Sequence, residues 1–261
     1  MASRETESIV LRTTDFGESD RLVTFYTRAA GKLKGVARGA RRSRKRFVHA
    51  FEAGSRVELA CRDGKSLAWI EACKLLDAHL ELRMDIHRWA YGAVALEIMD
   101  RMTPEGDAQE DLFELLAGVL EHLGRDSDPE NAMVLFLVGF LAKSGYLPAW
   151  SGCAVCGLPA EGSISWWWDL AQGRLACPQH RGGGSPLALD LGTLKLMDQV
   201  RRRPSRRIWR LHLRRERKAP MLNALLDWIR TQIHRDLNSM AILRQIRESA
   251  GSPVAPIRKR S

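Results

Sequence analysis

The sequence contains no hydrophobic run long enough to cross a bilayer. The longest apolar run, residues 132–142, has 11 residues, whereas a membrane-spanning helix needs about 20. Arg4, Glu5 and Glu7 interrupt the start of the chain before an apolar stretch can form, so no export signal is expected. We therefore predict a cytoplasmic protein without a membrane partner, in which residues 132–142 form a buried helix.

Cysteine is also scarce, with five residues in a chain of 261. An odd number of cysteines without an export signal is typical of the reducing cytosol, where thiolates bind metals instead of forming disulfides. The chain is therefore not expected to be a disulfide-stabilised secreted scaffold.

Two families of catalytic motif are incomplete. Residues 64–66 (GKS) match the end of a phosphate-binding loop, but the first glycine of that motif would fall on Leu59. Residues 79–81 (HLE) match the start of a zinc deaminase motif, but Gly152 stands where that motif requires proline before its CxxC pair. Neither ATP hydrolysis nor deamination is expected, and we predict that the chain is not an enzyme.

Three of the five cysteines lie within a window of 28 residues, as Cys153-x2-Cys156 and, 20 residues later, Cys177-x2-His180. Two short ligand pairs separated by a loop suit a tetrahedral Zn²⁺ site. Four protein ligands leave no open coordination position, so the predicted zinc is structural. Ordinary buried thiols are the alternative, and Asp169 or water is the alternative to His180 as fourth ligand.

The net charge of +10 and the pI of about 9.8 favour a polyanionic partner if the charge is clustered. It is clustered in two segments. The first has eight basic residues within fifteen and no acid: Lys32, Lys34, Arg38, Arg41, Arg42, Arg44, Lys45 and Arg46.

The second basic segment, residues 201–218, contains ten Lys or Arg and the single acid Glu216. A solvated surface is the plain alternative for both segments, but mixed signs serve solubility better. We expect both segments to contact nucleic acid through the phosphate backbone. The candidates in the second segment are Arg201, Arg202, Arg203, Arg206, Arg207 and Arg210.

Short alternating segments predict strands at residues 8–13, 21–27, 35–37, 56–62 and 67–73. Five strands within about 75 residues indicate a small barrel, of which the OB-fold is the commonest that binds nucleic acid. An SH3-like barrel fits almost as well. Phe25, Tyr26, Phe47 and Trp69 could stack bases. A core position is the expectation for each, because alternation buries about half of the side chains of a strand.

Helical periodicity follows at residues 75–147, 189–201 and 220–247, with Pro220 expected in a first helical turn. The predicted fold class is α+β and multidomain: an OB-fold barrel and then a mainly helical domain with an inserted zinc module. The expected division is residues 1–80 (barrel), 81–150 and 182–250 (helical domain), 151–181 (zinc module) and 251–261, a flexible basic tail.

Four segments together resemble the bacterial RecO family of DNA repair proteins. They are residues 16–26 (FGESDRLVTFY), 31–42 (GKLKGVARGARR), 145–148 (GYLP) and 235–239 (RDLNS), in the order in which the family has them. Residues 36–40 (VARGA) are the most specific part.

The resemblance implies a non-enzymatic recombination mediator. Such a protein binds single- and double-stranded DNA, anneals complementary strands and, with RecR, helps RecA displace the single-strand-binding protein SSB. It implies an N-terminal OB-fold, and DNA contacts by the first basic segment, above all Arg38, Arg41 and Arg42. His180 stands where many members have cysteine, and some members lack the metal ligands.

Two other functions stay open. Asp15, Glu18 and Asp20 could hold Mg²⁺ in a nuclease, although acids on a turn between strands are more often solvated. A zinc-ribbon transcription or RNA-binding factor is the other alternative.

Overall fold

The computed structural model describes residues 3–43, 45–64, 66–126, 128–147, 150–161, 165–183, 186–233 and 236–251. Several sequence predictions lie outside these residues. They are Arg44 of the first basic segment, Pro148 and Arg235 of the family-like segments, and residues 252–261 of the expected tail.

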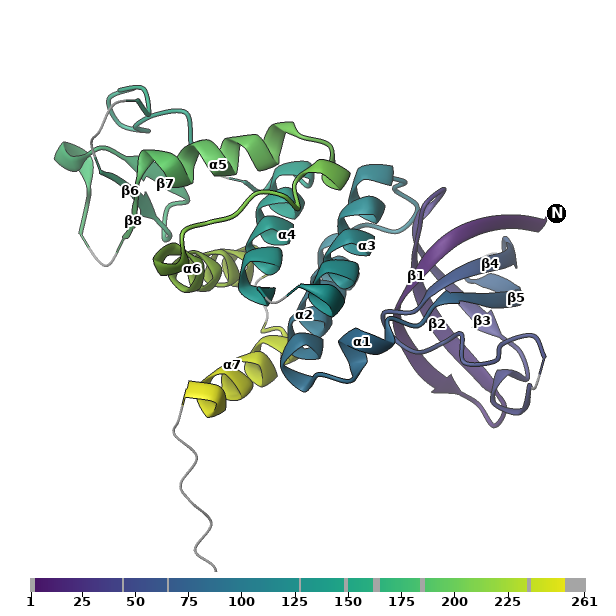
Figure 1. The fold of residues 1–261 in the computed structure, drawn as a ribbon. Helices are drawn as coiled ribbons and strands as arrows, with labels where there is room; N and C mark the ends of the chain where they lie inside the picture. Colours follow the sequence, from purple (N-terminus) through teal and green to yellow (C-terminus); the bar gives the residue numbers. More distant parts are fainter. Residues whose placement is uncertain are drawn as a thin grey trace, which may run out of the picture.

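A closed five-stranded barrel forms the N-terminal part of the molecule (Figure 1). Its strands are β1 (Ser3–Phe16), β2 (Asp20–Thr27), β3 (Gly31–Ala37), β4 (Arg56–Arg62) and β5 (Ala68–Asp77). All five predicted strands are present, and β1 is longer than predicted because its two halves pair with different neighbours. Its second half pairs with β2, and its first half pairs with β4 to close the barrel.

The strand order identifies the barrel as an OB-fold. Around the barrel the order is β1-β2-β3-β5-β4, so β5 lies between β3 and β4. β3 and β5 are parallel, with Val36 opposite Trp69, while the other pairs are antiparallel. A parallel pair needs a crossover and cannot come from a simple meander. This pairing confirms the predicted OB-fold and removes the SH3-like alternative.

In the described ranges, seven helices follow the barrel or flank the small sheet described below. They are α1 (Leu80–Arg83), α2 (Ile86–Met102), α3 (Glu110–Arg125), α4 (Pro129–Lys143), α5 (Leu191–Arg202), α6 (Arg215–Ile233) and α7 (Asn238–Gly251). α4 contains the apolar run 132–142 and is buried along nearly its whole length, as predicted for that run. Asp128 caps α4 by accepting a hydrogen bond from the Asn131 N–H.

Residues 220–247 do not form one helix beginning near Pro220. α6 starts at Arg215, so Pro220 is inside the helix. It ends at Ile233, and a separate helix, α7, begins at Asn238. The predicted first residue of this helix was wrong because the first helical turn of α6, residues 215–219, is strongly basic. This turn lacks the apolar periodicity on which the prediction relied.

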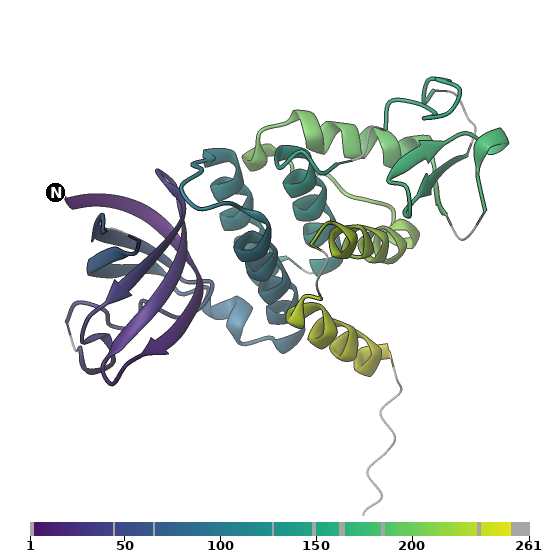
Figure 2. The same ribbon diagram turned by 180° about the vertical axis from the view of Figure 1, so that it is seen from behind.

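A small three-stranded sheet lies at the far end of the helices from the barrel (Figures 1 and 2). It consists of β6 (Trp166–Asp169), β7 (Arg174–Ala176) and β8 (Leu187–Leu189), with β6 in the centre. Trp166 and Trp168 are fully buried on one face of β6, and the half-buried Trp167 on the other face stacks with Arg181 at 3.7 Å. The alternation of a strand therefore divides the three consecutive tryptophans between its two faces.

The described residues form two hydrophobic cores. One fills the barrel interior. The other joins the helices to the small sheet, including Cys153, Trp166 and Trp168, and extends to Ile9 and Tyr26 on the outside of the barrel. The barrel is thus docked on the helices through the outer face of β1 and β2. No helix in the described ranges combines the length and apolar character that a membrane span requires.

Polar contacts complete the docking of the barrel. Arg28, in the turn after β2, bonds to Glu7 of β1 at 3.0 Å and forms an ion pair with Glu114 of α3. Arg206 of the short 3₁₀ helix η3 (Ser205–Arg207) binds the same Glu114 at 2.6 Å. One carboxylate therefore links the barrel, α3 and η3.

Candidate nucleic-acid interface and metal centre

Lys32 and Lys34 of the first basic segment lie on β3 itself, and the other described residues of the segment form a loop that begins at the end of this strand. Gly39 has φ +65°, a left-handed conformation that glycine adopts without strain, and it leads into the short 3₁₀ helix η1 (Ala40–Arg42). The Gly39 N–H donates to Asp20 Oδ1 at 2.8 Å, and the Arg41 N–H donates to the Ser19 carbonyl at 3.0 Å. The turn between β1 and β2 therefore holds η1 in place.

The structure brings most, but not all, of the predicted basic side chains together on this loop. Lys34 is half-buried and paired with Glu105 at 2.6 Å. Lys32 is buried, and its Nζ donates to the Asp100 carbonyl at 2.6 Å between barrel and helices. Burial lowers the pKa of Lys32. The side chains that face solvent are those of Arg38, Arg41, Arg42, Lys45 and Arg46.

Of the four aromatic candidates in the barrel, only Trp69 lies beside these side chains on the surface. Phe25, Tyr26 and Phe47 are buried, whereas Trp69 is 40% exposed. The guanidinium carbon of Arg38 lies 4.2 Å from the centre of the Trp69 ring.

The second basic segment lies at the end of α5 and in the chain that follows it. Arg201 and Arg202 both bind Asp198, and Arg206 is held by Glu114. Arg203, Arg207 and Arg210 are exposed, and they form no ion pair with an acid in the described part of the chain. Among the six candidates of this segment, these three are therefore the basic groups most accessible to a phosphate.

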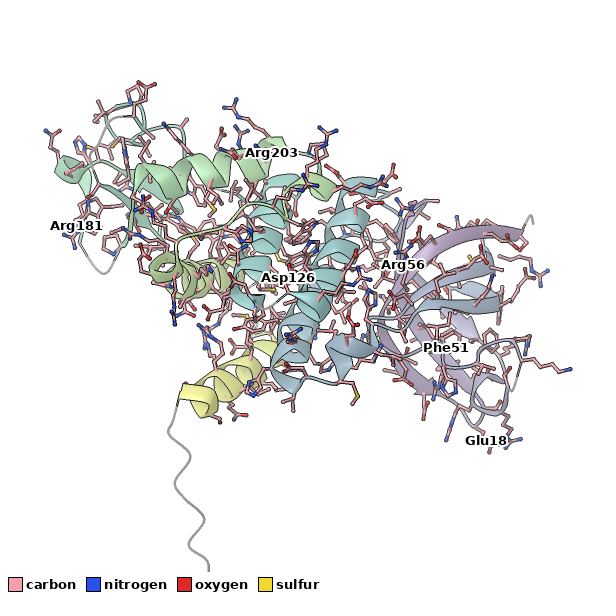
Figure 3. All side chains as sticks on the ribbon, in the orientation of Figure 1. Glu18, Phe51, Arg56, Asp126, Arg181 and Arg203 are labelled. Atoms are coloured by element: carbon pink, nitrogen blue, oxygen red, sulfur yellow. The ribbon has the colours of Figure 1, made fainter. Side chains whose placement is uncertain are left out.

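The two basic surfaces lie apart on the molecule. Figure 3 shows Arg203 on the helical part and Glu18, in the turn that supports η1, at the outer end of the barrel. α2 and α3 stand between them (Figure 1). One chain therefore presents two basic surfaces, not one continuous groove.

Two of the three acids proposed for a nuclease, Asp15 and Asp20, have other partners. Asp20 accepts hydrogen bonds from the Gly39 N–H and the Ser19 hydroxyl, and the first of these lowers the pKa of Asp20. Asp15 forms ion pairs with Arg21 and Arg41. Within the described residues, the only group of three or more His, Cys, Asp or Glu side chains able to share a metal ion is the cysteine–histidine group.

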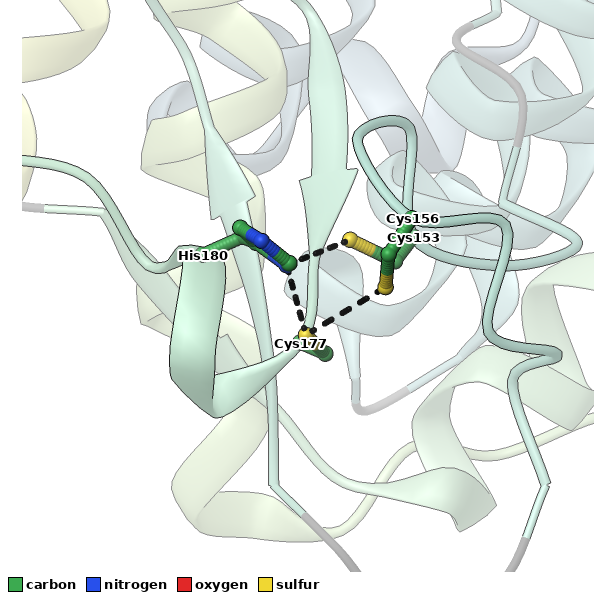
Figure 4. A group of neighbouring side chains, drawn as sticks. All are labelled: Cys153, Cys156, Cys177 and His180. Atoms are coloured by element: carbon green, nitrogen blue, oxygen red, sulfur yellow. Dashed lines mark hydrogen bonds between the residues drawn. The ribbon is translucent and has the colours of Figure 1, made fainter.

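Cys153, Cys156, Cys177 and His180 converge as predicted (Figure 4). Their ligand atoms all lie within 4.8 Å of one another. The Cys153 and Cys177 sulfurs lie 3.7 Å and 3.2 Å from His180 Nδ1, and the Cys156 and Cys177 sulfurs lie 3.9 Å apart. Cys153 and Cys156 lie on a turn that is closed by a hydrogen bond from the Gly157 N–H to the Cys153 carbonyl. Cys177 and His180 follow β7.

These separations fit a tetrahedral site. Metal–sulfur bonds of about 2.3 Å and metal–nitrogen bonds of about 2.0 Å place two sulfurs about 3.8 Å apart, and sulfur and nitrogen about 3.6 Å apart. Asp169, the alternative fourth ligand, instead caps the turn after β6 by accepting from the Ala171 and Gln172 N–H groups. The group can therefore hold a metal ion with four protein ligands.

The electrostatics of Cys153 favour its thiolate. Burial raises the pKa of this thiol, but the backbone N–H groups of Cys156, Cys177 and Val155 outweigh that effect and lower it to about 6. A thiolate is the form of cysteine that binds metals.

Comparisons with known proteins cover nearly the whole chain. The family model described as "Recombination protein O N terminal" matches residues 1–79, and "Recombination protein O C terminal" matches residues 83–241. The DNA repair protein RecO of Syntrophobacter fumaroxidans is 46% identical over 246 residues, which are 94% of this chain and 98% of that protein. The RecO proteins of Symbiobacterium thermophilum and Geobacter sulfurreducens are both 33% identical, over 95% and 92% of this chain and 100% and 97% of their own lengths.

Proposed function

The chain belongs to the RecO family of DNA repair proteins, and from that membership we propose that it acts as a recombination mediator. It binds single- and double-stranded DNA and anneals complementary strands. Together with RecR it helps RecA load onto DNA that SSB covers. It works in the cytoplasm, associated with the nucleoid.

The observation that carries this proposal is the presence of two separate exposed basic surfaces. The first is formed by Arg38, Arg41, Arg42, Lys45 and Arg46, and the second by Arg203, Arg207 and Arg210, with Arg201, Arg202 and Arg206 beside it. Two DNA strands repel each other, so annealing needs cationic groups that hold both strands and leave their bases free. Two surfaces on one rigid molecule meet that need, and contacts to phosphate let the strands slide into register.

We propose that the protein performs no bond-breaking step. Asp15 and Asp20 support the turn under η1 instead of meeting in a metal site. A four-ligand cysteine–histidine group has no open position for an attacking water.

The metal that we propose for this group is zinc, in a structural role. Zinc accepts three thiolates and one imidazole in tetrahedral geometry. Bound to Cys153, Cys156, Cys177 and His180, it would join the turn before β6 to the chain after β7. The donor set supports the same assignment, because soft thiolates select against magnesium and calcium.

We propose that each predicted domain has its own function. Residues 1–80 provide the first DNA surface. Residues 81–150 and 182–250 provide the scaffold and the second DNA surface, and residues 151–181 form the zinc module.

Annealing of complementary oligonucleotides coated with SSB tests the proposal. The protein should accelerate duplex formation, and the DNA should stay intact with Mg²⁺ or Mn²⁺. The double variants Arg41→Glu/Arg42→Glu and Arg203→Glu/Arg207→Glu should each lose annealing, since each removes one of the two strand-holding surfaces. Lys74→Glu changes an exposed charge outside both surfaces and serves as the control.

Degraded DNA would indicate a nuclease instead. Annealing that survives both double variants would refute the assignment of the two surfaces. A zinc-ribbon transcription or RNA-binding factor would show no annealing on DNA covered by SSB.

A further inference from the structure

A partly exposed indole ring lies against Arg38 of the first basic surface. Trp69 is on β5 between Ala68 and Ile70, which are 5% and 4% exposed, whereas Trp69 itself is 40% exposed. The alternation of the strand thus turns its neighbours into the barrel core and Trp69 outward. The barrel interior does not require an aromatic residue at this position.

The backbone places this ring next to the start of the basic loop. Trp69 is paired with Val36 of β3, two residues before Arg38. The loop is attached to the same strand, because the Cys73 N–H donates to the Arg46 carbonyl at 3.0 Å. Arg46 in turn donates from Nη2 to the Arg38 carbonyl at 3.0 Å. These bonds place the ring, Arg38 and Arg46 together on one surface.

The edge of the ring is kept open by a glycine. A Cβ atom at Gly64, in the turn between β4 and β5, would lie 3.2 Å from Trp69 Nε1 and 2.1 Å from the Leu67 carbonyl oxygen. A side chain at residue 64 would collide with this turn and crowd the indole.

We propose that Trp69 is a stacking site for one base of single-stranded DNA, with Arg38 as its cationic partner. This inference rests on the DNA-binding function proposed above and adds recognition of a base to the contacts with phosphate. Arg38 covers the ring in the free protein. A cation over an exposed ring is held less strongly than a stacked base, so a base can take its place. Arg38 then meets the neighbouring phosphate.

Such a site distinguishes single strands from duplexes. Bases inside a duplex are already stacked on their neighbours and cannot offer a free face to the indole. Binding to phosphates alone, by contrast, attracts both forms of DNA.

Two probes with the same phosphates separate the base contact from the charge contacts. One is a fluorescein-labelled oligothymidylate, and the other is an abasic strand of the same length; binding is followed by fluorescence anisotropy at one fixed salt concentration. The wild type should bind the oligothymidylate about 10-fold more tightly than the abasic strand. Trp69→Ala should abolish this preference and leave abasic-strand and duplex affinity within about 2-fold.

Three further variants sharpen the test. Trp69→Phe should keep most of the preference because it keeps an aromatic face. Arg38→Ala should weaken binding to both probes while the ratio between them persists. Leu76→Ala removes another exposed apolar side chain from β5 and should change neither affinity.

The proposal is overturned if Trp69→Ala keeps the preference for bases, or if it weakens binding to both strands equally. In both cases the protein still binds DNA, so the function proposed above stands. A wild type that binds neither probe overturns the DNA-binding function itself.

Discussion

Replacing Glu114 with glutamine should loosen the barrel from the helices. The Glu114 carboxylate accepts two hydrogen bonds from Arg206, at 2.8 Å from Nε and 2.6 Å from Nη2, and it also pairs with Arg28 of the barrel. Its side chain is only 14% exposed. Glutamine keeps the shape of this side chain and removes its charge, so the more exposed Glu110 is the charged partner that the two arginines still share.

The pKa of Glu114 sets the size of the effect. Hydrogen bonds from Arg206, together with those from Arg28, lower this pKa from 4.5 to about 2, against the opposing effect of burial. A fall of this size corresponds to at most ~3 kcal/mol of unfolding free energy at neutral pH. Arg206 is 67% exposed, so solvent screens its share. We expect a loss of ~1–2 kcal/mol, which lowers the melting temperature by roughly 3–6 °C.

The effect of this charge should also depend on pH. Because the folded pKa of Glu114 lies below the unfolded value of 4.5, its stabilisation is fully present above pH 4.5. It is lost as the pH falls from 4.5 toward 2. The difference in stability between wild type and Glu114→Gln should therefore be large at pH 7 and shrink progressively below pH 4.5.

Urea unfolding followed by circular dichroism, at pH 7 and at several values below 4.5, measures both effects. Glu121→Gln is the matched control, because Glu121 lies on the same helix and pairs with Arg125 where both side chains are well exposed. This control should cost less than about 0.5 kcal/mol. Equal losses in the two variants, or a Glu114→Gln loss that does not change with pH, would refute the account of this ion pair.

Three further predictions concern the DNA surface, the metal group and the helix core. Arg41→Glu/Arg42→Glu should weaken binding to all DNA sequences alike. In a salt titration, the slope of log K against log salt concentration should become shallower by roughly 0.9 for each phosphate that is no longer neutralised. An unchanged slope would contradict the assignment. Cys177→Ser should remove one zinc per chain, measured by atomic emission, and lower the melting temperature. DNA affinity, measured below the melting temperature of the variant, should stay within about 2-fold of the wild type. Full zinc content would exclude Cys177 as a ligand. Gly118→Ala should destabilise the fold by ~1–2 kcal/mol in urea unfolding, because a Cβ atom would lie 2.5 Å from Nε1 of Trp209; a more stable variant would show that this indole moves aside freely.

Local patterns predicted the elements of this fold well. The five strands and most helices follow from alternation and helical periodicity, and residues 132–142 form the buried helix that their composition indicates. The ligand pairs of the metal group also lie close in sequence, and their spacing carries most of the geometry. The strand count indicated an OB-fold with an SH3-like barrel as a close alternative, and the family resemblance, confirmed by the comparisons, implied the OB-fold.

Long-range contacts could not be predicted in the same way. Phe25 and Tyr26 are neighbours in β2, and both are buried, but Phe25 packs inside the barrel while Tyr26 packs toward the helices. Alternation alone would expose one of the two, because it does not show that a second layer covers the outside of the barrel.

The basic segments show a similar limit. A charge count treats Lys32 and Arg38 alike, although Lys32 is buried against the Asp100 carbonyl and Arg38 is exposed. Lys32 is on β3 beside the helices, whereas Arg38 lies beyond the end of that strand. The acids that neutralise Arg206 and Lys34 are distant in sequence and become visible only in the fold. The DNA contacts of the individual arginines stay predictions.

The shared core of the small sheet and the helices bears on how this fold tolerates change. Trp166 and Trp168 anchor β6 by burying their rings among the helices, and Trp168 makes an edge contact with Trp228 of α6 at 6.3 Å. This attachment is apolar. Cys153 and Cys177 belong to the same core, but the Trp168 ring contacts α6 directly and not through them. A variant that lacks one of the four cysteine and histidine side chains should therefore keep β6 packed against the helices through its two buried tryptophans.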